Sequence, residues 1–173
     1  MDALKDHTIE FVALKDGVHQ FHFELGTRFF NAASDELLDD GLVTADVELE
    51  KGPAMLVAQI HCHGTVHTTC DHCNGPLDQP VDGRQREVFH LNGRQRFDGM
   101  EDDVVGLDPD DHAIELTHYL YECVRLAMPT RRLHAQGQCD PEVEAALARH
   151  QHTDGTEQGD PRWAALRTLK QQR

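Results

Sequence analysis

The strongest constraint on the fold comes from two consecutive runs in which apolar and polar residues alternate. In LVTADVELE, residues 42–50, every second side chain is apolar, and residues 55–63, MLVAQIHCH, repeat this period. A period of two places apolar side chains on one face of a β-strand and polar ones on the other. Lys51-Gly52-Pro53 lies between the runs and is typical of a turn. The sequence therefore predicts two half-buried strands, the second bent or bulged at Gly64.

The N-terminal region is predicted to hold a β-hairpin and a short helix. Apolar-rich runs at 8–14 and 18–25 flank Asp16-Gly17, a dipeptide that favours two-residue hairpin turns. Thr27 has a hydroxyl suited to capping a helix, and Gly41 is expected to end that helix.

The second half of the chain is predicted to be mainly helical. A strand at 84–91 precedes a helix from about Ile114 to Ala127, which carries an apolar stripe. Asp140-Pro141 is typical of a helix start, because the carboxylate can cap the first turn that proline fits. With strands first and helices last, we expect an α+β fold: an antiparallel sheet that could close into a barrel, followed by C-terminal helices.

Length and charge bound the organisation and the class of the protein. With 173 residues we expect an α+β domain at 1–150, and a polar linker with a C-terminal helix packing on the same domain at 151–173. The net charge of -15 argues against a nucleic-acid interface spread over the whole surface. The sequence has no run of 18 apolar residues and no apolar segment near its start, so we expect a cytoplasmic protein without membrane spans.

Four residues in two separate polar loops form a candidate metal site. Cys70 and Cys73 have the C-x2-C spacing that lets two thiolates bind one zinc ion from a tight turn. His134 and Cys139 lie in a later loop, and Cys139 directly precedes the expected helix start, whose dipole would favour a thiolate. Together they predict a closed, structural Cys3His zinc site. A redox pair is disfavoured because a strand precedes the motif and Gly-Pro follows it, and four independent loop residues remain the alternative.

The remaining cysteines and the histidines indicate less specific roles. Cys62 and Cys123 each fall on an apolar face and are expected to be buried, with Cys62 as a reserve ligand. His61, His63 and His67 share one face of a strand by parity, which leaves a histidine-rich metalloenzyme as an alternative. Surface histidines in an acidic protein are the simpler interpretation.

Arginines supply a candidate contact surface for RNA. Two GRQR repeats and an Arg-Arg pair near the proposed metal loop could form a basic strip on an acidic body. Pairing of these arginines with nearby acids is the competing interpretation, and the overall charge favours it. The candidate residues are Arg84, Arg86, Arg94, Arg96, Arg131 and Arg132. The sequence contains no G-x-S-x-G, phosphate-loop or G-x-G-x-x-G motif, so no enzyme is predicted.

An ordered set of motifs over residues 8–173 resembles the YceD family, the large ribosomal RNA subunit accumulation proteins, in a Bacteroidetes-like form. The set consists of the CDHC motif at 70–73, the helix ending at Pro129, H-x-x-x-x-C-D-P from His134, and D-P-R-W from Asp160. Many members of that family carry arginine beside the cysteine pair, where this chain has His72.

The resemblance implies a non-enzymatic ribosome-biogenesis factor that supports accumulation of large-subunit (23S) rRNA. Its expected partners are large-subunit rRNA or an assembling ribosomal protein, and we expect neither a small-molecule substrate nor a membrane. A zinc-stapled protein-interaction module is the alternative binding function.

Overall fold

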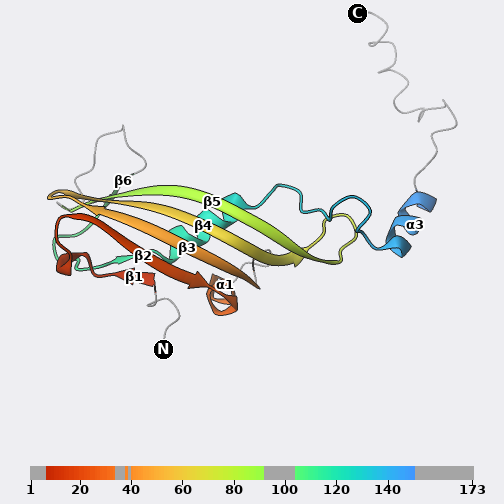
Figure 1. Ribbon diagram of the computed structural model, residues 1–173, viewed down its shortest axis with the longest axis horizontal. Helices are drawn as coiled ribbons and strands as arrows, with labels where there is room; N and C mark the ends of the chain where they lie inside the picture. The colour runs from red at the N-terminus through yellow and green to blue at the C-terminus, as the bar shows by residue number, and fades with distance from the viewer. Residues whose placement is uncertain (1–6, 34–37, 39, 92–103, 151–173) are drawn as a thin grey trace, which may run out of the picture.

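The computed structural model describes residues 7–33, 38, 40–91 and 104–150, and its centre is a five-stranded sheet (Figure 1). The strand order is β2-β3-β4-β5-β6. The pairs β2–β3, β3–β4 and β4–β5 are antiparallel, whereas β6 runs parallel to β5. The strands are β2 (Gly17–Leu25), β3 (Asp40–Lys51), β4 (Met55–Thr69), β5 (Pro76–His90) and β6 (Val104–Gly106).

The alternating runs form β3 and β4, as predicted. Residues 42–50 of β3 alternate between buried apolar side chains and exposed or half-buried ones, and Leu56, Ala58, Ile60 and Cys62 of β4 are also buried. These side chains form the core on one side of the sheet. The polar positions face outward on the other side, because a period of two sends successive side chains to opposite faces. The sheet is therefore half-buried, and its outer face is polar.

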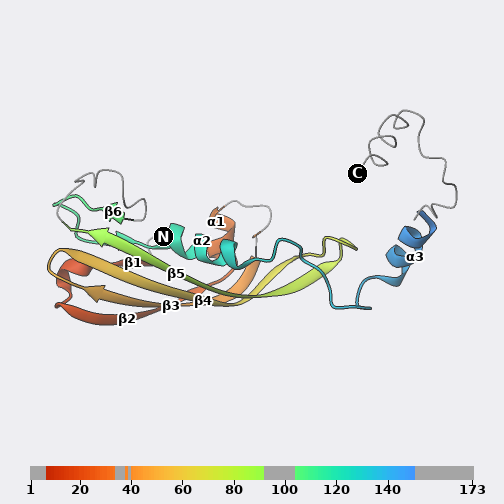
Figure 2. The ribbon, with the colours of Figure 1, turned by 90° about the horizontal axis from the view of Figure 1, so that it is seen from above.

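Two helices cover the inner face of the sheet. Figure 2 shows α1 (Thr27–Ala33) and α2 (Thr117–Ala127) on the same side. The apolar stripe of α2 buries Leu120, Cys123 and Val124 against the core. Gly83 of β5 allows this close approach, because a Cβ there would lie 2.8 Å from the Cys123 carbonyl oxygen. α2 is thus packed against the strand that follows the cysteine pair.

The N-terminal hairpin prediction is wrong. Residues 8–14 contain the short strand β1 (Thr8–Ile9) and a 3-10 helix, η2 (Phe11–Ala13), and β1 pairs with β7 (Ile114–Glu115) in a separate two-stranded sheet. β2 pairs with β3 instead. Lys51 explains part of the difference, because its Nζ donates to the carbonyl oxygens of Phe11 at 2.9 Å and Leu14 at 2.7 Å. These bonds satisfy the backbone of a segment that turns away from β2.

Three boundaries also differ from the sequence-based expectations. The expected helix from about Ile114 begins at Thr117, since its first residues pair with β1. Gly41 lies within β3 and does not end a helix. The strand expected at 84–91 begins at Pro76. Pro80 is tolerated there because that half of β5 pairs only with β4, so the missing N–H falls at a sheet edge.

The described sheet is open, with β2 and β6 at its two edges, so the alternative of a closed barrel does not apply. The α+β class, with a mostly antiparallel sheet and two helices in the C-terminal half, is confirmed. The last described helix, α3 (Pro141–His150), begins as predicted, and the Glu142 backbone N–H donates to Asp140 Oδ1 at 2.8 Å. The expected linker and helix at 151–173 lie outside the described residues. None of the described helices is long and apolar enough to cross a membrane.

Gly64 supplies a test of the β3–β4 packing. Its φ is +154°, and a Cβ at this position would lie 2.3 Å from the Leu42 carbonyl oxygen. We expect Gly64→Ala to lower the free energy of unfolding by about 1–3 kcal/mol, because strained backbone and a steric clash coincide. Urea unfolding measures the change. Gly26→Ala is the matched control, since no atom lies within 4 Å of its Cβ position; an equal loss in both variants would contradict this explanation.

Candidate metal centre

The loop between β4 and β5 folds the cysteine pair into a tight turn. The Cys70 N–H donates to the Gly75 carbonyl at 2.8 Å, and the Asn74 N–H donates to the Cys70 carbonyl at 2.8 Å. Asn74 adopts a left-handed conformation, with φ of 56°, which asparagine tolerates better than most residues. Both cysteines are buried. The turn therefore holds Cys70 and Cys73 in one sheltered position at the end of the long hairpin.

The loop between α2 and α3 is held against this turn by Asp71 and Arg132. The Asp71 N–H donates to the Arg132 carbonyl at 2.8 Å, and the Arg132 N–H donates back to Asp71 Oδ2 at 2.7 Å. The Arg132 guanidinium also pairs with Asp71 Oδ1 and donates to Thr68 Oγ1 at 3.0 Å. Backbone and side-chain bonds thus join the same two residues, and they fix the register of the two loops.

The contacts between Asp71 and Arg132 bring the four predicted donor residues together. The ligand atoms of Cys70, Cys73, His134 and Cys139 all lie within 4.8 Å of one another. His134 Nδ1 is 3.3 Å from Cys73 Sγ and 3.8 Å from Cys139 Sγ. A tetrahedral zinc ion with Zn–S bonds of about 2.3 Å holds its sulfur ligands about 3.8 Å apart. The donor set and its spacing therefore fit a closed zinc site.

The orientation of His134 also fits metal binding. Its Nε2 lies 2.8 Å from the Pro76 carbonyl oxygen, and this hydrogen bond requires the proton to be on Nε2. In the neutral ring, Nδ1, which faces the sulfurs, then carries the lone pair that a metal ion would bind. An outer hydrogen bond of this kind commonly fixes the tautomer of a metal-binding histidine.

Backbone N–H groups favour two thiolates in the turn. Burial raises the pKa of Cys70, but hydrogen bonds from the backbone of Cys73, His134 and His72 outweigh it and bring the pKa to about 6. The pKa of Cys73 is also lowered, chiefly by the backbone N–H of Asp140. Thiolates are the form of cysteine that binds zinc, so this environment prepares the pair for a cation.

Cys139 behaves differently from the sequence-based expectation. The helix start was expected to favour its thiolate, but burial and the neighbouring thiols of Cys73 and Cys70 raise its pKa to about 12. The reason is that the Asp140 N–H at the start of the helix acts on Cys73 instead. A third negative charge beside two thiolates is unfavourable until a cation compensates it.

Cys62 and Cys123 lie elsewhere and are both buried, as predicted. Cys62 belongs to the core between β4 and α2, where its Sγ is 3.9 Å from the Leu120 carbonyl oxygen. Among the described residues it is therefore not part of the donor group, so its reserve role as a ligand is not supported.

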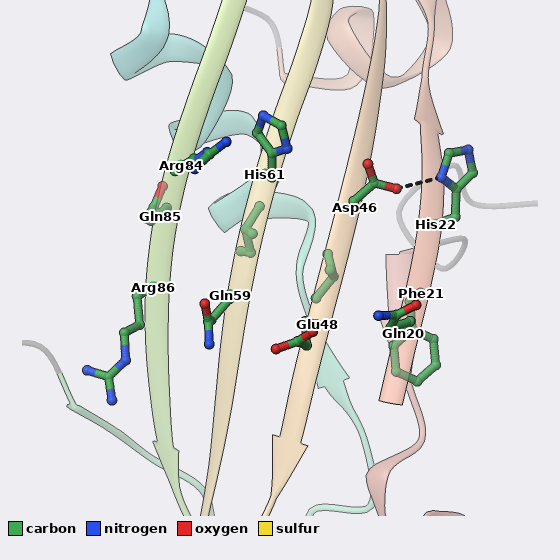
Figure 3. Close-up of a pocket in the computed structure, with 12 residues that line it drawn as sticks. Gln20, Phe21, His22, Asp46, Glu48, Gln59, His61, Arg84, Gln85 and Arg86 are labelled. Atoms are coloured by element: carbon green, nitrogen blue, oxygen red, sulfur yellow. Dashed lines mark hydrogen bonds and ion pairs between the residues drawn. The ribbon is translucent and has the colours of Figure 1, made fainter. Parts of the chain in front are cut away.

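The candidate RNA-binding arginines fall into separate groups. Arg84 and Arg86 lie on the outer face of β5 and line a groove of about 690 Å³ across four strands (Figure 3). The Arg132 guanidinium forms an ion pair with Asp71, whereas the neighbouring Arg131 is exposed. Arg94 and Arg96 lie outside the described residues. The four described candidates thus form no continuous basic strip and fall into two local groups, Arg84 with Arg86 and Arg131 with Arg132.

Sequence reasoning missed the parts that hold the site in place. Asp71 lies inside the C-x2-C motif, and Arg132 lies two residues before His134. An acidic and a basic residue next to the proposed ligands could have indicated an ion pair between the two loops. The Pro76 carbonyl left no signal, because any residue provides one. The groove was also missed, since it depends on the cross-strand register of β2 to β5.

Fold and donor set define an α+β protein in which a sheet hairpin and a helical segment meet at a group of three cysteines and one histidine. The family model for "Large ribosomal RNA subunit accumulation protein YceD" matches residues 58–170, more than half of the chain and including all four donor residues. The chain therefore belongs to the YceD family, whose name connects it with accumulation of large-subunit rRNA. No curated protein and no solved structure matches the chain.

Asp71 supplies a test of how the two loops are held. Asp71→Asn removes the ion pair and one strong acceptor for Arg132. We expect the Arg132 amide hydrogen to exchange with solvent severalfold faster, because this N–H donates directly to the Asp71 carboxylate. Hydrogen exchange followed by NMR measures the effect. Asp78→Asn is the control, since Asp78 is an exposed aspartate of β5 that pairs with His67. Unchanged exchange at Arg132 in Asp71→Asn would contradict this role.

Proposed function

We propose that this protein supports accumulation of large-subunit (23S) rRNA by binding in the cytoplasm, without catalysis, and that a structural zinc ion holds its two halves together. The single observation that carries the proposal is the convergence of four cysteine and histidine donors from distant loops, within the segment that matches the YceD family. Four protein donors complete a tetrahedral shell and leave no position for a reacting water, so this zinc would have a structural role.

Large-subunit rRNA is the partner that the groove on the outer face supports best. Arg84 and Arg86 are exposed on β5, and Gln20 and Gln59 lie across the same groove (Figure 3). Arginine contacts phosphate through paired N–H groups, and the amides can donate to and accept from bases. Arg131, which is exposed in the loop between α2 and α3, would add a further contact with rRNA. The groove also contains Asp46 and Glu48, so binding would be local and sensitive to salt.

A basic ribosomal protein is the second candidate partner. The net charge of -15 favours it, as do exposed carboxylates on the outer face of the sheet. In this alternative the acidic face would bind the cationic surface that the ribosomal protein later presents to rRNA. The carboxylates are Glu24, Glu48, Glu50, Asp78 and Asp82.

Zinc content provides the first test. Protein purified without an affinity-tag metal should contain one tightly held zinc ion per chain, and Cys70→Ser should lose most of it, because three protein ligands remain. Elemental analysis after extensive dialysis against a weak chelator measures this. Cys62→Ala is the control, since Cys62 is a buried cysteine outside the donor group. Tight zinc that persists unchanged in Cys70→Ser would contradict the assignment.

Binding to rRNA fragments provides the second test. The double variant Arg84→Ala/Arg86→Ala should bind more weakly across sequences and should reduce the slope of log affinity against log salt by about two, one phosphate contact for each arginine. Electrophoretic mobility shifts over a salt series measure both quantities. Arg149→Ala removes an exposed arginine of α3 as a control. Absence of binding by the unmodified protein at low salt would exclude the rRNA version and favour the basic ribosomal protein.

A further inference from the structure

The outer face of the sheet holds a second group of metal-binding side chains, away from the cysteines. The register places His22 of β2 opposite Asp46 of β3, and Asp46 opposite His61 of β4, so these three form a row across the strands (Figure 3). His63 is two residues further along β4 and therefore points to the same face. Antiparallel pairing thus brings three histidines and one carboxylate from three strands into one small area.

The distances within this group are those of a compact donor set. One ligand atom each of Asp46, His61 and His63 lies within 4.8 Å of the other two. His63 Nδ1 is 3.9 Å from Asp46 Oδ2, and the rings of His61 and His63 are 5.0 Å apart between centroids. His63 Nδ1 is inaccessible to solvent and has no hydrogen-bond partner in the described part of the chain. A buried ring nitrogen without a partner beside a carboxylate is costly unless a ligand completes it.

Two outer contacts orient these donors. His22 Nδ1 lies 2.8 Å from Asp46 Oδ1, which leaves Oδ2 directed toward His63. His61 Nε2 lies 3.3 Å from Asp82 Oδ2, which leaves Nδ1 of the same ring available. Carboxylate and histidine partners in this position are typical of metal sites, where they fix ligand orientation and raise ligand basicity.

We propose that Asp46, His61 and His63 form a second site for a borderline divalent cation of the zinc class, with His22 as a positioning residue. Two imidazoles and one carboxylate suit Zn²⁺ and its neighbours in the transition series better than Mg²⁺ or Ca²⁺, which prefer oxygen ligands. Three protein ligands leave at least one coordination position open. This distinguishes the site from the closed Cys3His set.

The group lies beside a surface that can bind an anion. Asp46 and His61 line the groove that also contains Arg84, which lies directly opposite His61 in the β4–β5 register. A cation next to an arginine creates a local positive field on an otherwise acidic face. The ion would therefore serve as an attachment point for an oxyanion, and this role does not depend on the zinc proposed at the cysteines.

Zinc titration of the full chain tests the proposal. In protein already loaded at the cysteine site, calorimetry with Zn²⁺ should show one further equivalent per chain, weaker than the first. His61→Ala and His63→Ala should each abolish the further equivalent, and His22→Ala should weaken it about 10–100-fold, the usual effect of removing an outer-shell partner. His67→Ala is the matched control, because His67 lies on the same face of β4 but pairs with Asp78, outside the group.

The outcomes separate the two metal sites. Cys70→Ser should lose the tight ion and keep the weaker one, so failure of either site can be recognised independently. Circular dichroism of each histidine variant checks that the sheet remains folded. A further equivalent that survives both His61→Ala and His63→Ala, or that disappears equally in His67→Ala, would overturn the proposal and indicate general binding by surface histidines. Absence of any further equivalent in the unmodified protein would also overturn it.

Discussion

The antiparallel pairing of β4 with β5 is the interaction on which the other features depend. Its register runs without a break from Met55 opposite His90 to Thr69 opposite Pro76. The inner face of this hairpin packs against α2, its outer face presents Arg84 beside His61, and its far end carries the cysteine turn. A shift of β5 by one residue against β4 would turn Arg84 and Asp82 to the inner face of the sheet. The cysteine turn and the β5 side chains beside the histidine group thus depend on one alignment of two strands, whereas Asp46 and His61 meet through the β3–β4 register.

Sequence alone predicts the parts of this arrangement that are encoded locally. Period-two alternation identifies β3 and the first half of β4, because a strand with one buried and one solvent-exposed face alternates apolar and polar residues. The grouping of Cys70 with Cys139 could be anticipated from ligand chemistry, since the order of the motifs limits the choices. The pairing of β1 with β7 could not, because its partner lies beyond the whole five-stranded sheet in sequence. The early start of β5 was hidden by Pro80, which is acceptable only on an unpaired edge.

The two candidate cation sites use different physical means within one acidic protein. The cysteine turn gathers negative charge by directing backbone N–H groups at sulfur, so the ionised form is favoured before any cation arrives. The histidine group uses neutral imidazoles, one carboxylate and outer partners that set ring orientation. The first set offers four protein donors, whereas the second offers three and lies beside a groove. Each arrangement is local, which explains why the net charge did not reveal it.

The small sheet of β1 and β7 has a consequence for the order of assembly. During synthesis, the strands from β2 to β5 can pair with their neighbours as each emerges, because these contacts join adjacent segments of the chain. Thr8 has to wait until Glu115 has been made, since only then does its partner strand exist. Until that time Phe11 lacks part of the core that covers it. The segment that carries β1 is therefore among the last described parts of the fold to pack, although it precedes the whole five-stranded sheet in the sequence.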